Sequence, residues 1–258
     1  MLIIVPPSES KRLALGHGRP VDLDALSFPE LTAVRTQVLD ALIATSTRPD
    51  AAKRLQVGPS VAALVTQNAS VRELPALPVL EIYSGPLHAG LDAESLSGAA
   101  MERAGQALVV ASPLWGLLRP VDRIPAYRLH ICSRLIGMDW LKPTWRPVLG
   151  PTLAQAAGPD GIVVDLRSPN YQAMGVPTGL GERVVNLHVD MKAGGGGGIG
   201  VVLAKQIRGQ AARHLLESAD VPRDPAALAE LLADRWPTRL EAPERPGKPW
   251  TLTLGTHT

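Results

Sequence analysis

The sequence predicts an α+β (mixed α/β) fold: a single unit, residues 1–258, with a mixed central sheet and a helical hairpin inserted near 29–70. Short apolar runs of strand length recur along the chain and stop at Pro, Gly or Ser. Between them, several segments carry apolar residues at helical spacing. A chain of 258 residues can bury a substantial core. Because aromatic residues make up only 3% of it, that core must be mostly aliphatic.

The predicted strands are apolar runs at residues 1–5, 79–83, 108–112, 161–166, 183–191, 199–204 and 250–254. Helices are predicted at 29–46, in two short pieces within 50–67, and at 93–107, 149–157, 201–217 and about 225–236. The glycine run at 193–198 has neither the Gly-Lys-Ser/Thr ending of a phosphate loop nor the setting of a dinucleotide fingerprint. We interpret it as a flexible connection between two strands.

Composition limits the possible partners and compartments. The net charge is only +2, so any preference for nucleic acid or phosphate must come from local patches. The single cysteine, Cys132, rules out an internal disulfide and fits a reducing compartment. The apolar start is too short for a signal peptide, and no run approaches the length of a membrane span. We therefore expect a cytoplasmic protein with no membrane partner.

Several kinds of chemistry lack their sequence signals. The six histidines show no spacing typical of zinc ligands, and His130 with Cys132 is a weak metal signal. No nucleophile motif such as G-x-S-x-G occurs. We expect no metal and no cofactor, and we interpret Cys132 as a small packed hydrophobe.

The end of the first predicted strand presents polar side chains. Pro6 and Pro7 stop the strand, and Ser8, Glu9 and Lys11 follow. Open sheets of parallel strands bind ligands at such ends, which makes these three residues candidates for catalysis. The alternative is an ordinary exit from a strand with a solvated lysine.

Residues 109–135 combine arginines, aromatics and prolines after a buried strand. Arg119, Asp122, Tyr127 and Arg128 lie between turns that suit a lined cavity better than a core. Guanidinium groups offer a flat fork of donors for an anionic or planar ligand. The alternative is that Arg119 and Asp122 form a salt bridge that pins an irregular loop. Tyr83, at the end of the second predicted strand, is a further candidate for ligand binding.

Two other stretches are candidate anion sites. In 50–67, Lys53, Arg54 and Gly58 surround a turn between short helices, as in a helix-hairpin-helix that binds DNA phosphates through backbone N–H groups. A plain helical hairpin is the alternative. In the helix at 201–217, Lys205 and Arg208 share one face, which would hold phosphate or simply face solvent.

The series S-P-L-W-G-L-L-R-P-V-D-R-I-P-A-Y-R-L at 112–129 resembles the signature of the YaaA family, the bacterial peroxide stress proteins. P-P-S-E at 6–9, Y-S-G at 83–85, an isolated Trp145 and A-K-Q-I-R-G at 204–209 follow the family's order. The sequence departs from the family at Arg146, where a glycine is usual. It departs again at Arg167 and Asn170, where the family has an alanine and an acid. The second departure removes a carboxylate and adds a cation, which would favour anions.

Two functions remain open at this point. The resemblance implies a cytosolic DNA-binding protein that limits oxidative damage linked to intracellular iron. The residues themselves also fit an enzyme that acts on a phosphorylated planar metabolite such as a purine nucleotide. In that case the basic residues hold phosphate, the tyrosines stack on the base, and Glu9 or Asp122 moves protons. The sequence fixes neither a reaction type nor an oligomeric state.

Overall fold

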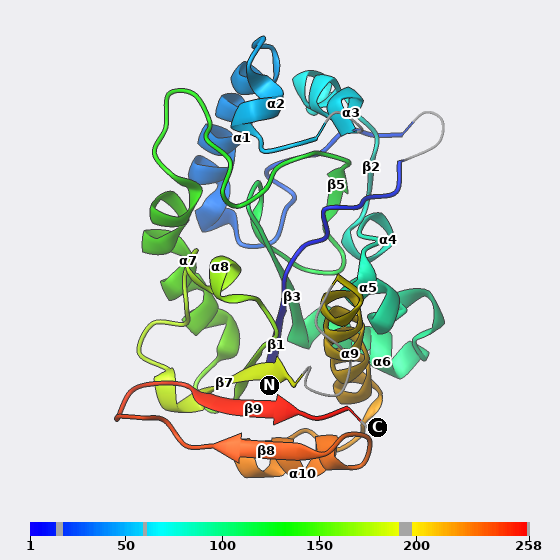
Figure 1. Ribbon diagram of the computed structural model, residues 1–258, viewed down its shortest axis with the longest axis vertical. Coiled ribbons are helices and arrows are strands. Elements are labelled where there is room, and N and C mark those ends of the chain that lie inside the picture. The colour runs from blue at the N-terminus through cyan, green and yellow to red at the C-terminus, as the bar shows by residue number, and fades with distance from the viewer. Residues whose placement is uncertain (14–17, 59–60, 191–197, 257–258) are drawn as a thin grey trace.

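The computed structural model describes residues 1–13, 18–58, 61–190 and 198–256. Within these ranges, seven strands form one mixed sheet and two more form a small antiparallel sheet (Figure 1). Helices pack around the large sheet, so the predicted mixed α/β class is confirmed. No helix in the described ranges has the length and apolar character needed to cross a bilayer.

The large sheet has the strand order β4-β3-β1-β6-β7-β9-β8. Its strands are β1 (Leu2–Val5), β3 (Leu108–Ser112), β4 (Gly116–Leu118), β6 (Val163–Asp165), β7 (Val184–Val189), β8 (Thr238–Glu241) and β9 (Trp250–Leu254). The inner strands run parallel, whereas β4 and β8 pair antiparallel at the two edges. β1 and β3 are buried along their whole length, as expected for strands covered by helices on both faces.

The helices lie on two sides of this sheet (Figure 1). One group is α5 (Pro86–Leu91), α6 (Gly98–Ala107) and α9 (Gly198–Glu217); the other is α7 (Leu141–Ala157) and α8 (Pro169–Gln172). α10 (Pro225–Ala233) packs beside β8 at the sheet edge. Gly90 and Gly209 let α5 and α9 approach closely, since a Cβ on Gly209 would stand 1.9 Å from the Leu87 carbonyl oxygen.

The strand order defines where a ligand is expected. The chain passes from β1 to its neighbour β3, then crosses back to β6 on the other side of β1, and continues outward to β7 and β9. The order of strands therefore reverses between β1 and β6. In open sheets of this kind, the crevice outside the carboxyl ends of the strands at the reversal is the usual ligand site.

The predicted helical region gathers at the end of the molecule away from β8 (Figure 1). It contains α1 (Thr32–Ser46), preceded by one 3-10 turn, then α2 (Ala51–Arg54) and α3 (Ala62–Gln67), near the small sheet of β2 (Ala76–Pro78) and β5 (Arg123–Pro125). Pro59 and Ser60 lie outside the described residues, so the helix-hairpin-helix geometry stays a prediction.

Two predicted strands are wrong. Residues 79–83 contain the helical turn α4 (Val79–Ile82), whose Val79 and Ile82 are buried three positions apart. Residues 199–204 are the first turns of α9, which continues without a break to Glu217. The place beside β7 is taken instead by β9. The glycine run at 193–197 lies outside the described residues, and Gly198 is the first residue of α9.

Other boundaries differ in detail. α7 begins at Leu141, well before the predicted start at 149, and contains both Pro147 and Pro151. The short strands β2, β4, β5 and β8 were not predicted, because three or four residues carry too little periodicity to be recognised.

Candidate functional site

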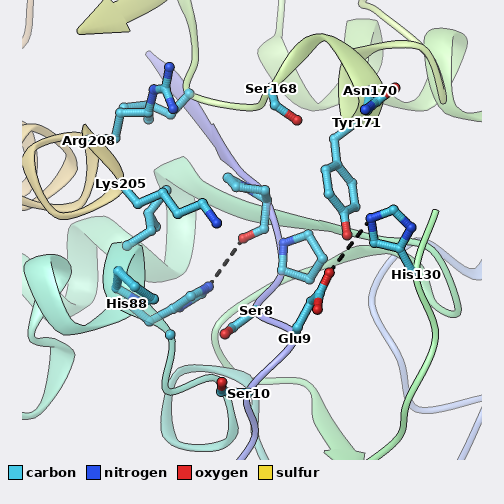
Figure 2. Close-up of a pocket in the computed structure, with 16 residues that line it drawn as sticks. Ser8, Glu9, Ser10, His88, His130, Ser168, Asn170, Tyr171, Lys205 and Arg208 are labelled. Carbon is cyan, nitrogen blue, oxygen red and sulfur yellow. Dashed lines mark hydrogen bonds and ion pairs between the residues drawn. The ribbon is translucent and has the colours of Figure 1, made fainter. Parts of the chain in front are cut away.

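A pocket of about 400 Å³ lies where the chain leaves β1 and β6. Figure 2 shows its walls: the loops after the two strands, the start of α5, and α9. Its lining residues are Pro6, Pro7, Ser8, Glu9, Ser10, Gly85, Pro86, Leu87, His88, His130, Leu166, Ser168, Asn170, Tyr171, Lys205 and Arg208. The pocket therefore occupies the crevice that the strand order predicts.

The loop after β1 is fastened to the segment before α5. Ser84 donates its backbone N–H to the Ser10 carbonyl over 3.2 Å, and Lys11 forms a β-bridge with Tyr83. Ser8 is buried against Gly85, where an added Cβ would stand 2.1 Å from the Ser8 Oγ. Only glycine at position 85 leaves room for the serine, so the Y-S-G stretch shapes the pocket floor.

Glu9 presents a half-exposed carboxylate to the pocket. Arg128 donates from Nη2 to Glu9 Oε2 over 2.7 Å, and Arg128 itself is only 15% exposed. His130 Nε2 lies 3.6 Å from the other oxygen, Oε1. Figure 2 shows the Tyr171 hydroxyl pointing toward this pair.

Local contacts fix the protons around Glu9. The Cys132 backbone N–H donates to His130 Nδ1 over 3.1 Å, so neutral His130 carries its proton on Nε2, facing the carboxylate. Burial raises the pKa of Tyr171, and the phenol of Tyr127 and the charge of Glu9 add to the shift. The Tyr171 hydroxyl is therefore protonated at neutral pH. This wall holds two donors beside one carboxylate.

The opposite wall is cationic. Lys205 and Arg208 project from α9 toward the pocket (Figure 2), on the side away from Glu9. Lys205 is exposed, whereas Arg208 is half-buried and its Nε has no hydrogen-bond partner among the described residues. Burial lowers the pKa of Arg208. An anion in the pocket would supply a partner for this Nε.

His88 lines the same side and is buried. Its Nε2 lies 3.2 Å from the Pro6 carbonyl oxygen, which can only accept, so Nε2 carries the proton. Burial lowers the pKa of His88 to about 4. The imidazole is thus neutral, and its Nδ1 has no partner within the described part of the chain.

Lys11 lies beside the pocket rather than in its lining. Its Nζ donates to the Ser8 carbonyl over 2.7 Å and stands 4.0 Å from the centre of the Tyr127 ring. Burial and, to a smaller extent, the charge of Arg128 lower the pKa of Lys11 to about 7, against the opposing charge of Glu9.

Tyr83 and Tyr127 form the layer under Lys11. Their hydroxyls are 2.9 Å apart, and the Tyr127 hydroxyl lies 2.8 Å from Ser112 Oγ at the end of β3. Burial raises the pKa of both phenols. Because both residues are buried and outside the pocket lining, their rings are not placed to stack on a ligand there.

Arg119 and Asp122 lie outside the pocket lining. Buried Asp122 accepts from the N–H and Oγ of Ser27 over 2.8 and 2.9 Å, and from the Arg119 backbone N–H over 2.7 Å. The Arg119 guanidinium donates to the carbonyl of Gln106 over 2.5 Å. Asp122 thus holds the loop by accepting from the backbone N–H of Arg119, rather than by a salt bridge to the Arg119 guanidinium.

The candidate DNA-binding residues lie in the helical region, apart from the pocket. Lys53 and Gly58 are exposed. Arg54 is partly buried, and its Nε donates to Asp50 Oδ2 over 2.8 Å. The exposed residue Arg134 is joined to this segment, because its backbone N–H donates to the Arg54 carbonyl.

Arg167 does not add charge to the pocket as its sequence position suggested. Its guanidinium binds Asp165 through Nη2 over 2.7 Å and Nε over 2.9 Å, and both side chains are fully buried. The pair is neutral overall. The Asn170 side chain lines the pocket and accepts from Lys142 Nζ over 2.8 Å.

Comparison with known proteins identifies the family of this chain. A family model described as peroxide stress protein YaaA matches residues 1–236. The chain belongs to the YaaA family. Its relatives include a UPF0246 protein of Streptomyces coelicolor, 37% identical over 264 residues, covering 100% of this chain and 99% of that protein. Another, from Corynebacterium efficiens, is 35% identical over 259 residues, which cover 98% of this chain and 99% of that protein. A third, from Shewanella piezotolerans, is 28% identical over 227 residues, which cover 84% of this chain and 86% of that protein.

The pocket residues of this YaaA-family chain that were not among the predicted site residues include His88, His130, Ser168 and Tyr171. The rule that singled out Ser8 and Glu9 would have found two of them, because Ser168 and Tyr171 follow the strand predicted at 161–166. His130 was considered only as a metal ligand. Among the described residues, no group of three or more His, Cys, Asp or Glu side chains is arranged to hold a metal ion.

Proposed function

We propose that this YaaA-family protein acts in the peroxide stress response by binding a phosphorylated planar metabolite, such as a purine nucleotide, in the pocket between β1 and β6. One observation carries the proposal. Lys205 and Arg208 from α9 meet Ser8 and Glu9 from the first loop around one cavity, at the carboxyl ends of the parallel strands.

The two walls divide the work of binding. Lys205 and Arg208 hold the phosphate, because charge-assisted bonds to phosphate are short and strong. The Arg208 Nε, which has no partner within the described ranges, supports this assignment. The planar part of the ligand lies by Tyr171, the aromatic residue of the lining, rather than by Tyr83 or Tyr127. We assign proton transfer in an enzymatic reaction to Glu9, with Ser8 and Lys11 beside it.

Ligand-dependent stability tests this proposal. A ligand that binds only the folded state raises stability by about 2.7 kcal/mol at a hundredfold excess over Kd. Nucleoside monophosphates or diphosphates should raise the melting temperature, whereas inorganic phosphate alone should change it little. Lys205→Ala and Arg208→Ala should abolish the shift, and Lys53→Ala, an exposed lysine far from the pocket, should preserve it. A shift that survives in both pocket variants would contradict the proposal.

Duplex DNA is the second candidate ligand, and the family resemblance suggests it, together with a cytoplasmic role in limiting iron-linked oxidative damage. The exposed Lys53, Gly58 and Arg134 favour it, since Lys53 lies in α2, Gly58 follows that helix, and the Arg134 backbone is bonded to it. Backbone contacts to phosphate would make the binding independent of DNA sequence.

Salt dependence separates this candidate from the first. Lys53→Ala combined with Arg54→Ala should weaken duplex binding equally for all DNA sequences. It should also reduce the slope of log K against log salt concentration by about one for each lost phosphate contact. Lys205→Ala is the matched control and should leave that slope unchanged. Duplex binding that is absent at low salt, or unchanged in the double variant, would remove α2 and α3 from the account.

A further inference from the structure

We infer that the pocket selects guanine nucleotides, with the phosphate on Lys205 and Arg208 and the base edge on Glu9, His130 and Tyr171. This inference rests on the proposed function, because it names the ligand of the same pocket.

The pocket is polarised from one wall to the other. Lys205 and Arg208 line the pocket, and among the described residues neither has a carboxylate oxygen within 4.0 Å. Glu9 stands on the opposite wall (Figure 2). A ligand that bridges the walls must be anionic at one end and must offer hydrogen-bond donors at the other.

The Glu9 carboxylate is fixed and still has acceptor capacity. Arg128 holds Oε2 at 2.7 Å, whereas His130 Nε2 is 3.6 Å from Oε1, too far for a hydrogen bond. A carboxylate has about four acceptor positions and can take two parallel N–H bonds. Its half-exposed side chain leaves these positions open to the pocket.

The neighbours of Glu9 complete a pattern. His130 carries its neutral-state proton on Nε2, and the Tyr171 hydroxyl stays protonated, so both are donors beside the carboxylate. The wall therefore presents two donors next to the two acceptor oxygens of the Glu9 carboxylate. Guanine presents the complement: the O6 acceptor, then the N1–H and the N2 amino donors. Adenine instead places the N1 lone pair where it would face the carboxylate, and hypoxanthine lacks the second donor.

Titration calorimetry with GMP, IMP and AMP on the unaltered protein tests the inference. GMP should bind about ten- to a hundredfold more tightly than AMP, as expected for hydrogen bonds to a charged group, and IMP should fall between them. Equal affinity for the three nucleotides would overturn the inference while the proposed function stands. Absence of binding by all three would overturn both.

The Glu9→Gln variant provides a second test of the inference. An amide offers one donor and one acceptor, which suits adenine, so the variant should lose the preference for GMP and gain affinity for AMP. Glu102→Gln, an exposed carboxylate on α6, is the matched control and should keep the preference. Melting curves without ligand verify that both variants fold. A Glu9→Gln variant that still prefers GMP tenfold would overturn the inference.

Discussion

Arg128 and Glu9 form a 2.7 Å ion pair although 119 residues separate them in the chain. The pair joins the central signature to the P-P-S-E stretch. The backbone of Arg128 is held in turn by fully buried Asn68, which donates to the Arg128 carbonyl and accepts from its N–H, both over 2.8 Å. The helical region around α3 therefore positions Arg128, which in turn holds the pocket residue Glu9.

Asn68→Ala should destabilise the protein by about 2–6 kcal/mol, because it leaves two backbone groups of Arg128 without partners and each such loss costs about 1–3 kcal/mol. It should also weaken nucleotide binding, since Arg128 would no longer hold Glu9. Urea unfolding and calorimetry measure the two effects. Gln210→Ala, an exposed amide on α9, is the control. A loss of stability below about 0.5 kcal/mol would contradict this role of Asn68.

Arg35→Met should cost about 3 kcal/mol or more, because two buried carbonyl groups and a partly buried one lose their donor. Fully buried Arg35 donates to the carbonyls of Trp115, Ser27 and Leu117 over 2.6–2.8 Å. The central signature thus depends on a guanidinium of α1. Urea unfolding tests this against Arg48→Met, an exposed arginine, which should change stability by less than about 0.5 kcal/mol. Similar values for both variants would show that Arg35 does not support the signature.

Asp122→Ala should lower stability by about 2–3 kcal/mol and leave the nucleotide Kd within about twofold, because its contacts are to Ser27 and Arg119 rather than to the pocket. Denaturation and calorimetry on the same sample compare the two quantities. A variant of unchanged stability that no longer binds nucleotide would instead place Asp122 in the site.

Lys11→Met should change how stability depends on pH. The folded-state pKa of Lys11 is lowered from its ordinary value of 10.5 to about 7. The unfolded state therefore binds more protons between these values, and the wild-type protein gains stability as pH rises through this window. Below pH 7 Lys11 is charged in both states, so the free-energy cost of burying its ammonium group is fully present. The stability of Lys11→Met relative to wild type should fall from pH 6.5 to pH 9.5, as urea unfolding at both pH values would measure. A constant difference would mean that Lys11 is not perturbed.

The sequence predicted the buried strands of the fold better than its short or amphipathic pieces. Apolar runs such as Leu2–Val5 and Leu108–Ser112 are strands because helices cover both faces of the sheet. Val79–Ile82, in which Glu81 interrupts three apolar residues, is helical, and a run of that length has no period that separates the two states. The run at 199–203 belongs to α9, and its Val201 and Val202 are exposed. Whether these two runs form strands or helices therefore depends on the rest of the fold and not on their local composition.

For the site, strand-end reasoning found Ser8 and Glu9, and charge spacing on a helix found Lys205 and Arg208. Neither kind of reasoning separated the residues that line the pocket from those that only stabilise the surrounding structure. Arg119 and Asp122 look like site residues in sequence, yet their partners are backbone groups and Ser27. Conversely, His130 enters the site only because the Glu9 loop is folded against it, a contact that no local pattern encodes.

A crystal structure of the protein with bound GMP tests the central claim most directly. The account predicts electron density in the pocket between β1 and β6, with the phosphate within 3.2 Å of Lys205 Nζ or the Arg208 guanidinium and the base beside Tyr171. Nucleotide bound elsewhere on the surface, or an empty pocket at a GMP concentration that saturates binding in solution, would contradict it.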